Sequence, residues 1–101
     1  MIVVNVTVEI DPQHLAAMKE GIAAMETASC LEAGCLDYCF SVEVNDPSKL
    51  RITEKWESKE ALFAHFTEPH MAAFQALIAN YPPKGMEAFF YEAEAFTPPG
   101  M

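Results

Sequence analysis

The chain has 101 residues, of which 51% are hydrophobic, and this is enough for one domain with a single core. Its 15 acidic and 6 basic side chains give a formal net charge of −9, which disfavours binding to nucleic acids and to anionic membranes. No apolar run reaches the roughly 20 residues of a membrane-spanning helix, and the first residues lack the basic segment of a secretory signal. We therefore expect one cytoplasmic domain over residues 1–101, with residues 96–101 as a short tail.

The first elements are predicted by alternation and by helix-capping residues. Residues 2–10 alternate between apolar and polar side chains, which is typical of a strand with one apolar face. Asp11 and Pro12 are typical of a helix N-cap and a first helical residue. The helix is expected to continue to about Leu31, with Gly34 as a left-handed residue at its end.

A second strand is predicted over residues 35–44, which again alternate. Its apolar face would carry Leu36, Tyr38, Phe40, Val42 and Val44. Cys35 and Cys39 would lie on the other face, about 13 Å apart at 3.3 Å per residue, which is too far for a disulfide or for shared metal ligation. With Cys30 the chain has three cysteines, an odd number that agrees with a reducing compartment.

The third strand contains the first indication of a site. Residues 45–48 have the composition of a turn, so a hairpin connects the second strand to a strand over residues 49–57. The apolar face of this strand carries Leu50, Ile52, Glu54 and Trp56. Glu54 is therefore a carboxylic acid among core residues, and such a position calls for a partner or a function.

The remaining elements are two helices and a strand. Ser58 is a typical N-cap of a short helix whose inward face includes His65. Pro69 interrupts this helix and begins a second one that ends near Asn80. Residues 86–96, rich in Phe and Tyr, predict the last strand.

The order β-α-β-β-α-β predicts an α+β, ferredoxin-like fold, a four-stranded antiparallel sheet with helices on one face. Both faces of several strands carry apolar or aromatic side chains, including Val3, Phe89, Phe90 and Tyr91, so the uncovered face is expected to need a partner. We therefore expect a homodimer that forms through the sheet faces.

His65 and Glu54 are the candidate catalytic residues. An inward imidazole needs a hydrogen-bond partner or a function, and Glu54 could fix its tautomer and raise its basicity. The alternative is that both side chains have structural roles. His70 begins the next helix, apart from His65, where a capping or rim role is as plausible as catalysis. The spacing of the two histidines fits no metal motif, so we expect neither a metal nor another cofactor.

Two further polar side chains are candidates for ligand binding. The indole N–H of Trp56 could donate to a ligand, or Trp56 could be a core residue. Asn5 could orient a ligand, or form hydrogen bonds across the sheet. The chain has no nucleotide-binding or nucleophile motif, so an enzyme of this kind would act on a substrate that supplies its own electrons.

One pattern in the chain resembles a known family. It reads Glu54-x-Trp56-x-Ser58-x-x-Ala61-Leu62-x-x-His65-x-x-x-Pro69-His70-x-x-x-Phe74, and it follows Gly34-Cys35-Leu36-Asp37-Tyr38. The pattern is similar to that of the antibiotic biosynthesis monooxygenases, which are dimeric α+β barrels, and most of all to the bacterial quinol monooxygenases. The resemblance implies oxidation of a small quinol or polyphenol by O2 without a cofactor.

The same resemblance implies roles for individual residues. His65 would be the base or proton carrier, supported by Glu54 and His70. Asn5 and Trp56 would line the pocket or orient the substrate oxygen, and Tyr38 and Phe40 would be aromatic walls. Haem is discounted because Gln75 stands where the haem-degrading branch has its ligating histidine. The alternatives are an isomerase of a small, possibly phosphorylated, carbonyl compound, and a stress-associated dimer that binds small molecules without catalysis.

Overall fold

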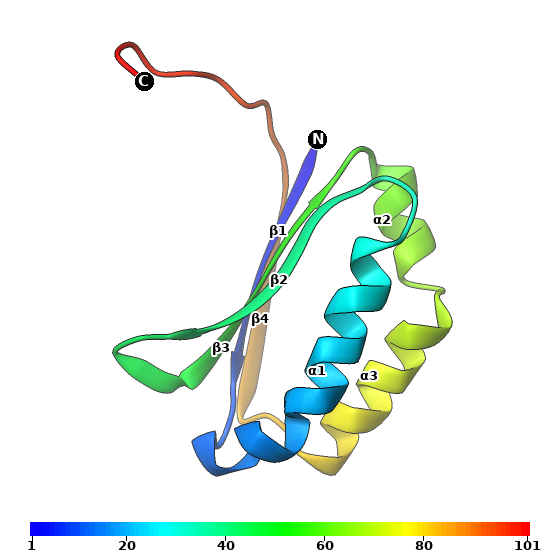
Figure 1. The fold of residues 1–101 in the computed structure, drawn as a ribbon, viewed down its shortest axis with the longest axis vertical. Helices are drawn as coiled ribbons and strands as arrows, with labels where there is room; N and C mark the ends of the chain where they lie inside the picture. The colour runs from blue at the N-terminus through cyan, green and yellow to red at the C-terminus, as the bar shows by residue number, and fades with distance from the viewer.

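The computed structural model describes residues 1–101 and has the expected α+β, ferredoxin-like architecture (Figure 1). The elements are β1 (Ile2–Glu9), a 3-10 turn η1 (Pro12–His14), α1 (Leu15–Cys30), β2 (Cys35–Glu43), β3 (Asp46–Trp56), α2 (Lys59–His65), α3 (Pro69–Asn80) and β4 (Gly85–Glu92). The predicted fold class is confirmed, including the break between two helices at Pro69. None of the helices has the length and apolar character that crossing a bilayer requires.

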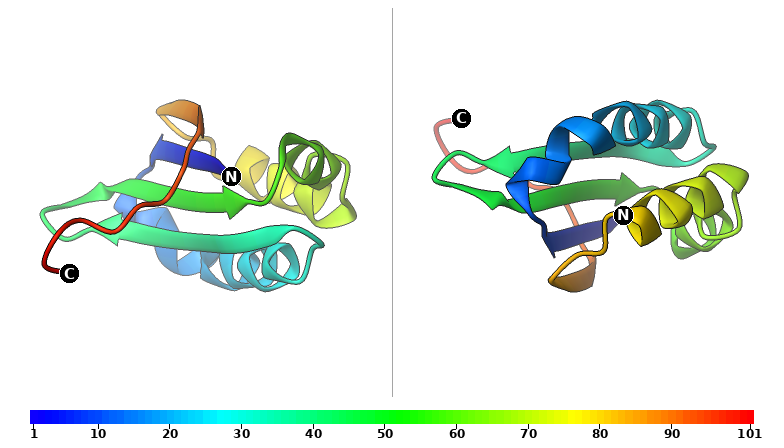
Figure 2. Two further views of the ribbon diagram at one scale, coloured as in Figure 1. Left: turned by 90° about the horizontal axis from the view of Figure 1, so that it is seen from above. Right: turned by 90° about the horizontal axis from the view of Figure 1, so that it is seen from below.

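The four strands form one antiparallel sheet in the order β2-β3-β1-β4. All helices lie on one side of this sheet, whereas the β2–β3 hairpin and the C-terminal segment extend away from them (Figures 1 and 2). α1 packs against β2 and α3, and α2 lies against β3. Each strand therefore has a helix-facing side and an uncovered side.

The core lies between the helices and the helix-facing side of the sheet. The predicted apolar face of β1 is confirmed, since Val4 and Val8 are each only 1% exposed. The backbone register places Val4 opposite Glu54 on β3 and opposite Phe90 on β4. Tyr38 on β2 pairs in turn with Glu54. These four residues form one row across the whole sheet, which we call the Glu54 row.

The helix starts follow from capping residues, with one difference from expectation. The Ser58 side chain accepts a hydrogen bond from the Ala61 N–H at 3.2 Å and caps α2, as predicted. Asp11 likewise accepts from the Gln13 N–H at 3.0 Å. The turn that Asp11 caps is the short η1, and α1 itself begins only at Leu15.

The alternation predicted for β2 is wrong at its first residues. A bulge between Cys35 and Asp37 places one extra residue in β2 opposite β3, which reverses the faces at this point. Leu36 is consequently 52% exposed, whereas Cys35 packs against the core. The same packing raises the pKa of the Cys35 thiol to about 11, chiefly because burial disfavours the thiolate.

The ends of the last strands also differ from the prediction. Glu43 pairs with Asp46, so β3 begins earlier than residue 49, and Val44 lies in the turn with 98% of its surface exposed. β4 ends at Glu92 rather than at residue 96. The last pair between the two strands is Ile2 with Glu92, and beyond it the Ala93 N–H donates to the Met1 carbonyl oxygen.

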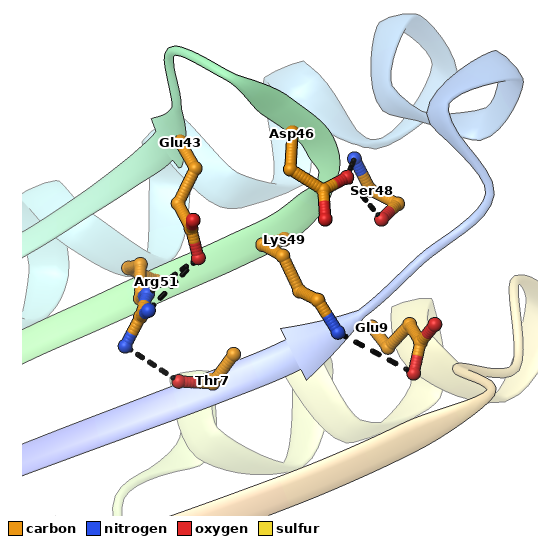
Figure 3. A network of polar contacts seen from close by, with 7 residues as sticks. All are labelled: Thr7, Glu9, Glu43, Asp46, Ser48, Lys49 and Arg51. Atoms are coloured by element: carbon orange, nitrogen blue, oxygen red, sulfur yellow. Dashed lines mark hydrogen bonds and ion pairs between the residues drawn. The ribbon is translucent and has the colours of Figure 1, made fainter.

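The uncovered face is polar over much of β1, β2 and β3. Arg51 on β3 donates to the Glu43 carboxylate on one side, at 2.8 Å from Nη2, and to the Thr7 hydroxyl on the other side, at 2.9 Å from Nη1 (Figure 3). Lys49 pairs with Glu9 at 3.6 Å in the same region. Asp46 closes the hairpin by accepting two hydrogen bonds from Ser48, which lower the pKa of its carboxyl group.

The apolar part of the uncovered face is smaller and lies along β1 and β4. It contains Val3, Phe89 and Tyr91, and the rings of Phe89 and Tyr91 stack with centroids 6.5 Å apart. Phe90, which follows Phe89 in the strand, points to the opposite face. Because it pairs with Val4, its side chain lies on the helix-facing side.

Gly34 is the position at which the backbone requires glycine. Its φ is +82°, and a Cβ atom there would lie 2.6 Å from Ala61 Cβ on α2. We expect Gly34→Ala to lower the free energy of unfolding by about 1–3 kcal/mol, through backbone strain and this clash. Chemical denaturation measures the loss. Gly85→Ala is the matched control, because its nearest neighbour is a flexible Glu9 oxygen at 3.7 Å; equal losses in the two variants would contradict the explanation.

Candidate functional site

A mostly apolar cavity of about 360 Å³ lies between the helix-facing side of the sheet and α3. All members of the Glu54 row contribute to its wall, and Phe74 and Gln75 of α3 line the opposite side. Glu54 is the only ionisable carboxylic acid that lines it, and no lysine or arginine does. A hydrophobic pocket with a few polar groups is the usual form of a small-molecule site.

A second depression, of about 440 Å³, lies between α2 and the end of β4. Its charged side chains are Lys59 and Glu92, which form an exposed ion pair with each other. It contains no buried acid or base, so we place the candidate site in the cavity at Glu54.

Glu54 is held in a fixed position and is almost completely buried. The residue is only 7% exposed, and its Oε1 accepts a hydrogen bond from the Trp56 indole N–H at 3.0 Å. Burial raises the pKa of the Glu54 carboxyl group, and the nearby Glu32 raises it further, whereas the Trp56 hydrogen bond and His65 lower it. A carboxylate of this kind is a stronger base than one in water.

Trp56 acts on Glu54, whereas the sequence suggested that it could meet a ligand directly. The residue is fully buried, and it does not line the cavity. Its N–H points to the Glu54 carboxylate, so its place in the site is that of a group which orients the acid.

His65 is buried, as expected, but its carboxylate partner is different from the one expected. Its Nδ1 lies 2.6 Å from Glu32 Oε2, and no hydrogen bond joins it to Glu54. The ring packs against Trp56 and Tyr38, with centroid distances of 4.8 and 5.4 Å. Its Nε2 is buried without a hydrogen-bond partner. His65 therefore packs on residues near Glu54 but does not line the cavity.

His70 lies beside His65, which corrects the expectation that the two helices keep these imidazoles apart. His70 Nε2 is 2.6 Å from the same Glu32 oxygen, and the two ring centroids are 5.9 Å apart. Glu32, His65 and His70 thus bring three metal-ligating atoms within 4.8 Å of one another. This geometry could hold a cation, although the sequence spacing of the histidines indicated no metal site.

The other candidate residues separate into those at the cavity and those away from it. Tyr38 lines the cavity, and burial raises the pKa of its hydroxyl. Phe40 does not line it, but packs against Phe74 with ring centroids 5.4 Å apart. Asn5 is exposed on the uncovered face, where it pairs with Thr53 and Phe89 in the backbone register. It therefore lies on the opposite side of the sheet from Glu54.

Three residues of this region were not singled out from the sequence as parts of a site. Glu32 belongs to the turn after α1, and no local pattern connects it with histidines more than thirty positions away. Phe90 needed the strand register, which alternation alone did not provide for the last strand. Gln75 follows the inward Phe74 on α3, and this polar residue beside a core position was a usable signal.

Comparison with known proteins agrees with this architecture. The family model for antibiotic biosynthesis monooxygenases matches residues 1–77. A solved structure of a candidate antibiotic biosynthesis monooxygenase from Deinococcus radiodurans is similar, with 25% identity, a TM-score of 0.89, and 99% of this chain and 100% of that chain covered. No curated protein matches the sequence.

Other solved structures with lower identity support the fold. A candidate antibiotic biosynthesis monooxygenase from Nitrosomonas europaea has 18% identity and a TM-score of 0.85, covering 92% of this chain and 98% of that one. A conserved protein from Methanosarcina mazei has 22% identity and a TM-score of 0.85, covering 92% of each chain.

The fold is thus a ferredoxin-like α+β domain with a mostly apolar cavity on its helix-covered face. The chain belongs to the antibiotic biosynthesis monooxygenase family, as its sequence pattern indicated.

The raised pKa of Glu54 predicts how the stability depends on pH. Because its pKa is higher in the folded state than in the unfolded state, the folded state is favoured while Glu54 is protonated, and this contribution is lost as the pH rises through the folded-state pKa. We expect Glu54→Gln to stabilise the protein at pH 7 by about 1 kcal/mol, since it removes a buried charge and keeps an oxygen that can accept from Trp56.

Thermal unfolding measured at several pH values tests this expectation. The gain in Glu54→Gln should shrink as the pH falls toward the ordinary range of a glutamic acid, where the wild-type side chain is protonated as well. Glu20→Gln, an exposed position on α1, is the matched control and should show no such dependence. A destabilisation by Glu54→Gln that grows toward neutral pH would contradict the prediction.

Proposed function

We propose that the protein is a monooxygenase that oxidises a small quinol or related polyphenol with O2 and requires no cofactor. The observation that carries the proposal is Glu54, a buried carboxylic acid in the wall of an apolar cavity. The volume of about 360 Å³ lies within the usual range of small-molecule sites. Membership of the antibiotic biosynthesis monooxygenase family supports the reaction class.

The first step is removal of a phenolic proton by Glu54. The apolar wall around Glu54 disfavours its ionised form, and this makes it a better acceptor for the proton of a phenol, whose ordinary pKa is about 10. Trp56 holds the carboxylate in place through its N–H. The Tyr38 and Phe90 rings form the walls against which an aromatic substrate packs.

The phenolate then supplies the electrons for oxygen chemistry. It transfers one electron to O2, and the two radicals combine to form a carbon–oxygen bond. Cleavage of the O–O bond leaves one oxygen atom in the product and releases the other as water with two hydrogen atoms from the substrate. The substrate is therefore the reductant, and the protein provides the base, the orientation and an environment from which water is excluded.

His65 has a supporting role in this proposal, and it acts through Glu54. It does not line the cavity, but its ring packs on Trp56, whose N–H holds the Glu54 carboxylate in place. The absence of lysine and arginine from the cavity wall favours an unphosphorylated substrate.

Oxygen consumption with menadiol or an anthrone tests the proposal. We expect Glu54→Gln to lose about 10²–10⁴-fold in rate, which is the usual contribution of a positioned base, and His65→Ala to lose less. Glu20→Gln, on the exposed side of α1, is the control and should keep the wild-type rate. Equal rates in Glu54→Gln and the wild type would overturn the role of Glu54. Turnover of a carbonyl substrate without O2 would instead support the isomerase alternative, and tight binding without turnover would support a binding protein.

We further propose that the protein is a homodimer joined through the uncovered sheet faces. Val3, Phe89 and Tyr91 form the apolar patch on this face, and Phe89 and Tyr91 are 50% and 49% exposed. Patches of this kind favour association with a second copy. The cytoplasmic location stays a prediction from composition.

Sedimentation equilibrium tests the assembly. We expect about twice the chain mass of 11.2 kDa at micromolar concentration. Phe89→Glu should shift the mass toward that of one chain, because it buries a charge in the interface. Phe63→Glu is the matched control, since Phe63 is 58% exposed on α2, on the other side of the sheet. A wild-type mass near that of one chain would refute the dimer.

A further inference from the structure

Glu32, His65 and His70 meet although they belong to three different segments. Glu32 lies in the turn between α1 and β2, His65 is the last residue of α2, and His70 is the second residue of α3. Their three ligating atoms, Oε2, Nδ1 and Nε2, lie within 4.8 Å of one another. We propose that these residues, which we call the Glu32 cluster, bind a divalent transition-metal cation of the zinc type.

The donor set determines which cation fits. Two imidazole nitrogens and one carboxylate oxygen are typical ligands of Zn²⁺, and three protein ligands leave a fourth position for water. Mg²⁺ and Ca²⁺ prefer sites composed of oxygen atoms, so the two histidines disfavour them. The same donors also accept Co²⁺, which provides a spectroscopic substitute for Zn²⁺.

The geometry requires only a small change for an ion to enter. Tetrahedral zinc with bonds of 2.0–2.2 Å separates its ligand atoms by about 3.4 Å. The Glu32 oxygen lies 2.6 Å from each histidine nitrogen and would move away by about 0.8 Å, and the two nitrogens, within 4.8 Å of each other, would approach by at most about 1.4 Å. Each neutral imidazole can carry its proton on its other nitrogen. An ion can therefore replace the two hydrogen bonds without a change in the charge of either histidine.

The charges around the cluster favour a cation. The Glu32 side chain is 8% exposed, and Glu54, whose pKa it raises, is 7% exposed. Neither carboxylate forms an ion pair with a lysine or an arginine. Buried carboxylates are normally paired or bound to metal. A divalent cation at Glu32 would compensate the negative charge of both carboxylates.

The position of the cluster also determines what the ion would do. The His70 side chain is 19% exposed and the His65 side chain 1%, so an ion would enter from the His70 side. None of the three ligands lines the cavity at Glu54. Because each ligand comes from a different segment, the cation would connect the α1–β2 turn, α2 and α3, and its binding energy would add to the stability of the fold.

Zinc titration of chelator-treated protein tests the proposal. Calorimetry should give one Zn²⁺ per chain, and Zn²⁺ should raise the melting temperature. Co²⁺ should give the visible absorption of a tetrahedral site. His70→Ala removes the most exposed ligand, and we expect it to weaken binding more than the roughly 10–100-fold lost with groups that only orient a ligand. His14→Ala is the matched control, because His14 packs on Tyr81 outside the cluster.

Circular dichroism shows whether His70→Ala folds. If it does not, a second variant keeps the test valid. Glu32→Gln keeps the shape of the side chain and an oxygen that can accept hydrogen bonds, but it removes the charge, and it should weaken binding in the same way. A stoichiometry below one ion per chain would overturn the proposal. So would a loss of zinc affinity in His14→Ala equal to that in His70→Ala. A thiolate-to-cobalt charge-transfer band would also overturn it, since it would place the ion on the free cysteines.

Discussion

The burial of one carboxylic acid on an otherwise apolar sheet face is the constraint on which the site depends. Glu54 is on β3, which lies between β2 and β1, and the residues paired with it on these strands, Tyr38 and Val4, also face the core. An isolated acid in such a place would cost several kcal/mol if it were ionised without partners. The Trp56 hydrogen bond and the opening of the cavity beside Glu54 offset this cost. Burial of the Glu54 carboxylate lowers the stability of the fold, but it provides a base in a position where water has little access.

The two histidines show how backbone geometry brings together groups that lie on separate helices. α2 ends at His65, and Pro69 begins α3 after a short turn, so the chain changes direction between the two imidazoles. Glu32, in the turn after α1, lies between them, with its Oε2 2.6 Å from a ring nitrogen of each. The result is a polar cluster that connects three segments behind the apolar cavity.

Much of the fold could be predicted from the sequence, since its signals are local. Alternation identified β1 and β3, and it identified Glu54 as an acid among core residues. Caps and Pro69 located the helices. The prediction failed where structure depends on distant partners. The bulge after Cys35 reverses the faces of the first residues of β2 without any local sign, and Phe90 could be assigned to the cavity only from its pairing with β1.

The candidate site was predictable in part for the same reason. His65 and Glu54 were both expected to be inward, and both are buried. Their expected contact was wrong, because the partner of His65 is Glu32, a turn residue whose position depends on the whole α1–β2 connection. Asn5 lies on the opposite side of the sheet, although its polar character had suggested a ligand-binding role.

The edge position of β4 has a consequence for how a ligand reaches the cavity. β4 pairs through its backbone with β1 alone, and each of its residues is exposed, yet Met86, Ala88 and Phe90 form one wall of the cavity. Strands with few buried contacts open locally at a lower free-energy cost than central ones. Local opening of β4 would therefore widen the cavity while β1 and β3 stay paired. A small ligand would then have a route into the cavity beside this edge strand, without a separate lid.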